Sequence, residues 1–335
     1  MSVPRPAAAP GAAAPAATDP SWWVAVASAA SLGREPLRVQ REGEVLVLWR
    51  DERGIPAALQ DRCPHRGASL SLGRVEDGAI ECAYHGWRFA PGGRCRSIPA
   101  RPGLDPPQRA RAWRAHEAEG LVWVAGDAAP AMPPTLGDVP RRRVLCGPYE
   151  VQTSAPRVIE NFLDTAHFAF VHAQWLGDRA HAEVPPYEVR LDAEGRPGVD
   201  HYRAWQPRAS TSAAGGAWVD YRYQVLGPHA ALLVKQAQGA ALAEAYAVLA
   251  CPLDDDHTRL WFVLATSDEA TPDDELRAFQ ERIFGQDRAI LESQRPRRLP
   301  LGEDAPGAEL HGPADRLSVA YRRYLRSCGI ACGVT

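Results

Sequence analysis

Short apolar runs broken by turn residues dominate the first third of the chain, and this pattern is typical of β-strands. Gly and Pro in segments such as Pro91-Gly92-Gly93 mark the turns between the runs. The pattern predicts an antiparallel β domain over residues 19–130. Its strands are expected at residues 44–49, 55–59, 80–82, 87–89 and 120–125.

The pattern changes after a Pro-rich connector at residues 129–134. Residues 155–171 carry a helical apolar period, and alternating segments between 185 and 266 predict a second antiparallel sheet. A helix is expected over 273–294, because acidic residues occupy its first turn and Pro296 follows its end. Residues 131–335 are therefore predicted to form a second domain of an α+β protein.

Composition narrows the class of protein. The 335 residues are 45% hydrophobic and carry a formal charge of −3, which argues against a nucleic-acid-binding surface. No apolar run reaches the length of a membrane span, and the Ala/Pro-rich residues 1–18 predict a disordered tail rather than a secretory signal. Seven cysteines, an odd and scattered number, predict reduced thiols in the cytoplasm and make metal binding a possibility.

Two short segments combine one cysteine with one histidine. Cys63-Pro64-His65 is followed after sixteen residues by Cys82-Ala83-Tyr84-His85. Four zinc ligands, or unrelated buried thiols and exposed imidazoles, are alternatives. However, a Cys-x-His segment with a Cys-x₂-His segment is the ligand set of a Rieske [2Fe-2S] cluster, in which thiolates hold one iron and imidazoles the other.

A second group of metal-binding residue types lies at Asn161, Asp164, His167 and His172. His167 and His172 are five residues apart, so a straight helix would turn them about 140° away from each other. Both bind one metal only if the helix bends or ends between them. Two histidines and one carboxylate are the protein ligands of non-haem Fe(II) oxygenases.

Periodicity selects the carboxylate. In the helix expected at 273–294, the apolar positions Phe279, Ile283, Ile290 and Leu291 form a stripe, and Asp287 falls on it. A carboxylate on a buried helix face is costly unless it is paired or bound to metal. Asp287 is therefore the predicted third ligand; the alternative is an ion pair with an arginine such as Arg157.

Both groups of residues resemble the Rieske non-haem iron oxygenases, over roughly residues 20–126, 158–177 and 279–296. The loops Cys63-Pro64-His65-Arg66-Gly67-Ala68 and Cys82-Ala83-Tyr84-His85-Gly86-Trp87 are similar to the two cluster loops of that family. Respiratory-chain Rieske proteins have an additional cysteine in each loop, where this chain has Ala68 and Tyr84. Asn161, Asp164, His167 and His172 match the family's second motif, and the chain is similar to the vanillate O-demethylase and dicamba monooxygenase group.

The resemblance implies an N-terminal all-β Rieske domain and a C-terminal helix-grip catalytic domain. It implies a Rieske [2Fe-2S] cluster on Cys63, His65, Cys82 and His85, and a mononuclear Fe(II). It further implies O₂ as cosubstrate and electrons from NAD(P)H through a separate flavin reductase or ferredoxin. Family members form head-to-tail trimers, in which Asp164 would join His167 to His85 of the partner subunit; Asn161 and Asp164 are the candidate catalytic residues.

The implied reaction is hydroxylation or O- or N-demethylation of a small, aromatic substrate. An arene cis-dihydroxylating dioxygenase, a Rieske electron carrier and a zinc-stabilised binding protein are alternatives. The substrate is not predicted: no charged residue stands out as a clamp for a substrate carboxylate. The aromatic residues of the second sheet are expected in the core more than in a pocket, namely Trp205, Tyr221, Tyr223 and Tyr246.

Overall fold

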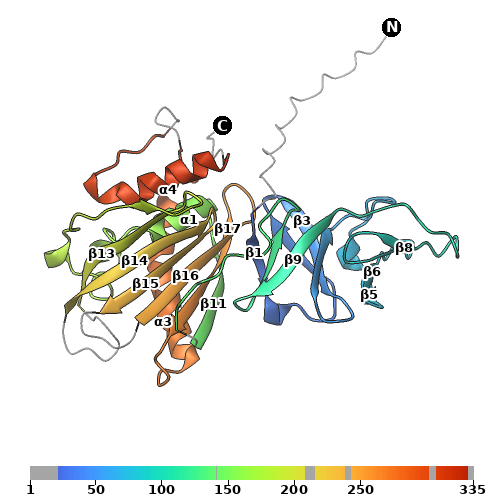
Figure 1. The fold of residues 1–335 in the computed structure, drawn as a ribbon, viewed down its shortest axis with the longest axis horizontal. Helices are drawn as coiled ribbons and strands as arrows, with labels where there is room; N and C mark the ends of the chain where they lie inside the picture. The colour runs from blue at the N-terminus through green and yellow to red at the C-terminus, as the bar shows by residue number, and fades with distance from the viewer. Residues whose placement is uncertain (1–21, 141, 208–215, 238–242, 302–306, 331–335) are drawn as a thin grey trace, which may run out of the picture.

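The computed structural model describes residues 22–140, 142–207, 216–237, 243–301 and 307–330, so the predicted tail at 1–18 lies outside them. Within these residues, the strands form three antiparallel sheets (Figure 1). The predicted strands at 44–49, 55–59 and 120–125 are confirmed.

The first sheet has the strand order β1-β10-β9-β4-β3-β2 among the described residues. Two of its hairpins close on a pair of residues with positive φ, Glu42 (51°) with Gly43 (76°) and Glu119 (53°) with Gly120 (73°). Such pairs match the twist of the flanking strands. The strands are β1 (Val24–Ser28), β2 (Leu37–Arg41), β3 (Glu44–Arg50), β4 (Pro56–Gln60), β9 (Ala112–Ala118) and β10 (Leu121–Ala125).

A smaller sheet of short strands, in the order β5-β6-β7-β8, projects from the first one. It lies at the end of the molecule farthest from the large sheet (Figure 1). Its buried side chains, including Ile80 and Phe89, share a core with Trp49 of β3. This packing attaches the small sheet to the first sheet. The strands are β5 (Arg74–Glu76), β6 (Ala79–Glu81), β7 (Arg88–Phe89) and β8 (Cys95–Ser97).

The large sheet has the order β11-β17-β16-β15-β14-β13-β12 in the described part of the chain. It therefore begins before residue 185, with a strand that the sequence pattern did not reveal. The strands are β11 (Arg142–Val151), β12 (Arg190–Leu191), β13 (Pro197–Gln206), β14 (Ala217–Gly227), β15 (Ala230–Ala237), β16 (Ala243–Pro252) and β17 (Thr258–Thr266).

Both faces of the large sheet are buried, which explains the unbroken apolar run of β17. Leu260, Phe262 and Leu264 face the core that contains the helices. Trp261 and Val263 face the first sheet and share its core with residues such as Val24 and Trp123. Strand residues point to alternate faces, so one strand serves both cores.

Helices cover one face of the large sheet (Figure 1). The predicted helix at 273–294 is confirmed as α3 (Asp273–Ser293). The helical pattern over 155–171 is divided between α1 (Ala155–Phe162) and the short α2 (Phe168–Val171). The other helices are α4 (Arg316–Ser327) and the 3₁₀ helices η1 (Ala29–Ser31), η2 (Leu70–Leu72), η3 (Arg179–His181) and η4 (Pro313–Asp315).

Candidate active site and metal centres

The two Cys/His loops lie side by side and have the same pattern of backbone hydrogen bonds; the first connects β4 to η2, and the second connects β6 to β7. In the first loop, the Cys63 amide donates to the Ala68 carbonyl at 2.8 Å, and the Gly67 amide donates to the Cys63 carbonyl at 2.8 Å. The second loop repeats both bonds at 2.8 and 2.9 Å, with Cys82, Trp87 and Gly86. Gly67 (φ 75°) and Gly86 (φ 66°) provide the left-handed residue that closes each loop.

The four side chains divide into a buried and an exposed pair. Cys63 and Cys82 are each 2% exposed, whereas His65 and His85 are exposed with ring centroids 4.6 Å apart. Burial raises the pKa of the Cys63 thiol to about 11. Two inner sulfurs and two outer imidazoles are the donor set that a Rieske cluster requires, so the residues fit this group.

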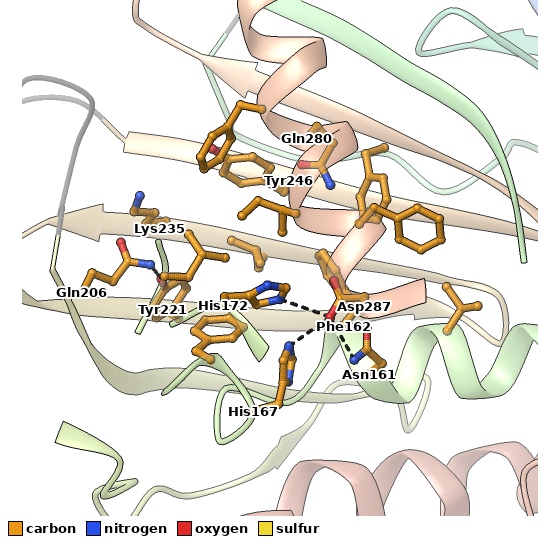
Figure 2. Close-up of a pocket in the computed structure, with 18 residues that line it drawn as sticks. Asn161, Phe162, His167, His172, Gln206, Tyr221, Lys235, Tyr246, Gln280 and Asp287 are labelled. Atoms are coloured by element: carbon orange, nitrogen blue, oxygen red, sulfur yellow. Dashed lines mark hydrogen bonds and ion pairs between the residues drawn. The ribbon is translucent and has the colours of Figure 1, made fainter. Parts of the chain in front are cut away.

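The second set of predicted ligands also comes together, between the helices and the large sheet. The Asp287 carboxylate oxygen Oδ1 lies 3.4 Å from His167 Nε2 and 3.1 Å from His172 Nε2 (Figure 2). One ligand atom from each residue falls within 4.8 Å of the others. These are the donors of a two-histidine, one-carboxylate iron site, and they leave one face open.

The short helix α2 solves the spacing problem of the two histidines, because it is only four residues long. Between α1 and α2, the Asp164 carboxylate accepts the Ala166 amide at 2.8 Å and the His167 amide at 3.2 Å. His167 then precedes the first residue of α2, and His172 follows its last. α2 ends at Val171, before His172, as the spacing requires, and both Nε2 atoms lie close to Asp287 Oδ1.

Each histidine is oriented by a hydrogen bond to its other nitrogen. His167 Nδ1 lies 2.9 Å from Asp164 Oδ2, and His172 Nδ1 lies 2.8 Å from Gln286 Oε1. Such partners fix the ring and its tautomer. Gln286 was missed by the sequence reasoning, although its position beside Asp287 on α3 is the signal that could have identified it.

The charges of the three ligands and of Asp164 compensate one another. Burial would lower the pKa of His167, but its hydrogen bonds to Asp164 and Asp287 outweigh burial and raise it to about 9. Burial would raise the pKa of Asp287, but its bonds to His167 and His172 outweigh that effect and lower it to about 2. A divalent cation would replace the proton of this cluster.

The alternative partner of Asp287 is excluded. Arg157 donates to Pro296 O and to Glu309 Oε1, at 2.7 Å from each through Nη2, and not to Asp287. The stripe used to select Asp287 is wrong at one position, because Ile290 is 45% exposed. The buried face of α3 runs instead through Gln280, Ile283, Phe284, Asp287 and Leu291.

A pocket opens beside the three ligands. Its apolar wall includes Phe162, Leu233, Phe262 and Ile283. Of the aromatic residues considered from sequence, Tyr221 and Tyr246 line it, whereas Tyr223 lies in the core and Trp205 stacks on His181. Asn161 also lines it, with Nδ2 3.4 Å from Asp287 Oδ1.

The sequence reasoning missed three polar residues of the pocket. These are Gln206, Gln280 and Lys235. No charged residue was expected to stand out as a clamp for a substrate carboxylate; Lys235 lines the pocket, but it is paired with Glu244, and no short motif marks it. It occupies a strand position in the part of the chain where resemblance to the family is weak.

Comparisons with known proteins identify the families of both halves of the chain. Residues 22–108 match the Rieske [2Fe-2S] domain, and residues 151–329 match the vanillate O-demethylase oxygenase C-terminal domain. The chain belongs to this family of Rieske non-haem iron oxygenases. It is thus an oxidoreductase with a cluster-bearing domain and an iron-dependent catalytic domain.

Individual relatives cover most of the chain. Methylxanthine N1-demethylase NdmA of Pseudomonas putida is 32% identical over 307 residues, which are 88% of this chain and 83% of the relative. The structure of Pseudomonas putida CBB5 NdmA with caffeine superposes with a TM-score of 0.78 at 28% identity, covering 92% of this chain and 90% of that one. Dicamba monooxygenase bound to dicamba shares the fold, with a TM-score of 0.73 at 24% identity over 92% and 96% of the chains.

The helices of the described residues include none that is both long and apolar enough to cross a membrane.

Proposed function

We propose that this chain is the oxygenase component of a multicomponent system that uses O₂ and externally supplied electrons to hydroxylate or demethylate a small aromatic molecule. The observation that carries the proposal is the His167, His172 and Asp287 triad, which opens into an apolar pocket of a chain that also bears paired Cys/His loops. A Rieske electron carrier would need only the first domain. The demethylase relatives support oxidation of a methyl group on nitrogen or oxygen.

The residues have distinct roles in this proposal. Cys63, Cys82, His65 and His85 hold the cluster. His167 and His172, with Asp287, hold the iron, which when bound supplies the chemistry of O₂ activation. Asp164 and Gln286 keep the two imidazole Nε2 atoms directed at the metal position, and Phe162 and Phe262 exclude water from the substrate space.

The placement of the two centres supports electron transfer between copies of the chain. The projecting sheet, whose strands β6 and β7 flank the second Cys/His loop, lies at the opposite end of the molecule from α3, which carries Asp287 of the triad (Figure 1). The exposed imidazoles His65 and His85 are available to another molecule. We therefore infer a homotrimer in which Asp164 joins His167 to His85 of the partner subunit, supplied by a reductase that oxidises NAD(P)H. A cytoplasmic location stays a prediction from the cysteine usage.

The test is an absorption and EPR spectrum of the purified protein, before and after dithionite, with a count of iron. About three irons per chain and a Rieske-type reduced signal are expected, two irons from the cluster and one from the triad. A colourless protein that contains zinc and lacks this signal contradicts the proposal. Product analysis then distinguishes a hydroxylated or demethylated product from a cis-diol.

A further inference from the structure

Lys235 is the only lysine in the sequence; the other 37 of its 38 basic Lys and Arg residues are arginines. This single lysine lies on β15, and its side chain lines the pocket beside the triad and is 13% exposed. A buried ammonium is costly unless hydrogen-bond acceptors surround it. The hydrogen-bond partners of Lys235 therefore indicate which substrate groups the pocket can bind.

Lys235 is electrically balanced within the sheet. Glu244 lies opposite it on β16, with Oε2 3.5 Å from Lys235 Nζ. The Tyr246 hydroxyl donates to the same carboxylate oxygen at 3.2 Å, and burial together with Glu244 raises the pKa of Tyr246 well above its usual value. The pair is thus neutral overall, and a substrate anion placed against Lys235 would be repelled by Glu244.

Lys235 still has donor capacity. An ammonium group has three N–H donors. Among the residues that the structure describes, Glu244 at 3.5 Å is its one hydrogen-bond partner. A neutral acceptor, such as a carbonyl oxygen, would complete its hydrogen bonding without adding charge.

A buried acceptor lies at the same end of the pocket. Gln206 is 1% exposed, and its Nε2 donates to the Tyr221 hydroxyl oxygen, whereas its Oε1 has no partner among the described residues. Tyr221 is opposite Lys235 in the register of β14 and β15. Figure 2 shows Gln206, Tyr221 and Lys235 grouped together at one end of the pocket. A buried acceptor without a donor is costly, so a ligand N–H there would be favourable.

From these positions we propose that Lys235 and Gln206 recognise a neutral amide-type group of the substrate, such as an aromatic amide or lactam. Lys235 donates to its carbonyl oxygen and Gln206 accepts its N–H, while Glu244 disfavours a carboxylate. This inference rests on the proposed function, because it assigns the substrate class of the same pocket. Lys235 is a specificity-determining residue in this scheme.

The test compares two probes of nearly equal shape, 4-methoxybenzamide and 4-methoxybenzoate, binding to the anaerobic metal-loaded protein by calorimetry. Wild type is expected to bind the amide at least about tenfold more tightly than the carboxylate. Lys235→Met should weaken amide binding about tenfold or more, because a charge-assisted hydrogen bond is lost. Glu244→Gln should reverse part of the preference by strengthening benzoate binding.

Arg222→Met is the matched control, because Arg222 is an exposed cation on the adjacent strand β14. It should leave both affinities unchanged. Equal affinities for amide and carboxylate in wild type, the same affinities in Lys235→Met, or binding of neither probe would overturn the inference. Iron content and O₂ consumption, measured on the same samples, test the proposed function separately.

The single lysine also allows a test that needs no variant. Reductive methylation can modify only Lys235 and the amino terminus, and the masses of the fragments after proteolysis distinguish the two sites. The amide should slow modification of Lys235, and the benzoate should not. Equal rates with and without the amide contradict the inference even if the variants fail to fold.

Discussion

Asp287 is the residue on which the mononuclear centre depends. It is buried on α3, and its Oδ1 contacts the Nε2 atoms of His167 at 3.4 Å and of His172 at 3.1 Å. The pKa of Asp287 is lowered to about 2, so the carboxylate is ionised and ready to bind a cation at neutral pH. The same carboxylate would be an uncompensated buried charge if both histidines were removed.

Asp287→Ala is expected to abolish mononuclear iron binding and leave the cluster intact. Loss of one of three protein ligands should reduce iron affinity by more than about 100-fold, beyond the usual cost of removing a supporting hydrogen bond. Iron analysis with EPR measures both centres in one sample. Asp274→Ala, at an exposed position in the first turn of α3, is the control. Full iron content in Asp287→Ala would remove Asp287 from the ligand set.

Asp164→Asn is expected to retain both metal centres and lose turnover by about tenfold or more. The amide keeps the shape of the side chain, but it removes the negative charge that orients His167 at 2.9 Å. Single-turnover product formation measures the effect. Normal turnover would refute the role of Asp164 as the bridge.

The chain contains a second Asp/His pair that provides a control for Asp164→Asn. Asp254 accepts the Asp256 amide at 2.9 Å and contacts His257 Nδ1 at 2.9 Å, the same arrangement on an exposed turn. Asp254→Asn should leave turnover unchanged. A similar loss in both variants would show that the effect is on folding and not on the site.

At the scale of helices and strands, the sequence predicts the features that depend on local spacing and periodicity. The Cys/His spacing identified one centre, and the five-residue spacing of His167 and His172 required a helix break, which the end of α2 at Val171 supplies. Asp287 was found on an apolar stripe although one member, Ile290, is exposed. The roles of Lys235 and Gln206 were not predictable. Their positions at the same end of the pocket depend on the register of strands β13, β14 and β15, which the sequence does not determine.

The packing of α2 also depends on a feature outside any motif. A Cβ atom on Gly177 would lie 2.4 Å from the Phe168 carbonyl carbon and 2.5 Å from the Ala169 amide nitrogen. Gly177→Ala must therefore displace the backbone that connects His167 with His172. Turnover should fall on the order of 100-fold, since small misplacements of catalytic groups carry costs of this size.

The matched control for Gly177→Ala is Gly285→Ala, on α3 between Phe284 and Gln286. A Cβ atom there would meet nothing within 4 Å. Alanine should be tolerated and should stabilise the helix by about 0.5–1 kcal/mol. Turnover and iron content of the two variants are compared at equal protein concentration; unchanged values for Gly177→Ala would show that α2 does not position the histidines.

At the scale of the whole molecule, two cores hold the centres in fixed positions. One core joins the first sheet to one face of the large sheet, through Val24, Trp123 and Trp261. The other joins the opposite face to α1, α3 and α4, through residues such as Ile159 and Leu325. The chain after α3 comes back into contact with α1 through hydrogen bonds of Arg157 to Pro296 and of Arg322 to Glu160. The C-terminal segment therefore stabilises the helix that carries Asn161.

A network of charged side chains attaches the segment after α3 to α1. Glu309 accepts from Arg157 at 2.7 Å and from Arg322 at 2.5 Å, and Arg322 also donates to Glu160 of α1 at 2.6 Å. Burial would raise the pKa of Glu309, but the bonds to both arginines outweigh it and lower the pKa below the ordinary 4.5. Ionised Glu309 therefore stabilises the folded chain above about pH 4.5, and the effect fades as pH falls through the lowered pKa.

Glu309→Gln should consequently destabilise the protein by about 1–2 kcal/mol at pH 7, because it leaves two buried guanidinium groups with less compensation. Thermal unfolding measured from pH 7 down to pH 4 should show the difference from wild type beginning to shrink below about pH 4.5, where Glu309 becomes protonated in the unfolded chain. Glu150→Gln, which alters an exposed pair with Arg259, is the control and should change stability little. A difference between Glu309→Gln and wild type that stays constant down to pH 4 would mean that the charge of Glu309 does not stabilise the fold, and that the segment is held by apolar packing of α4 instead.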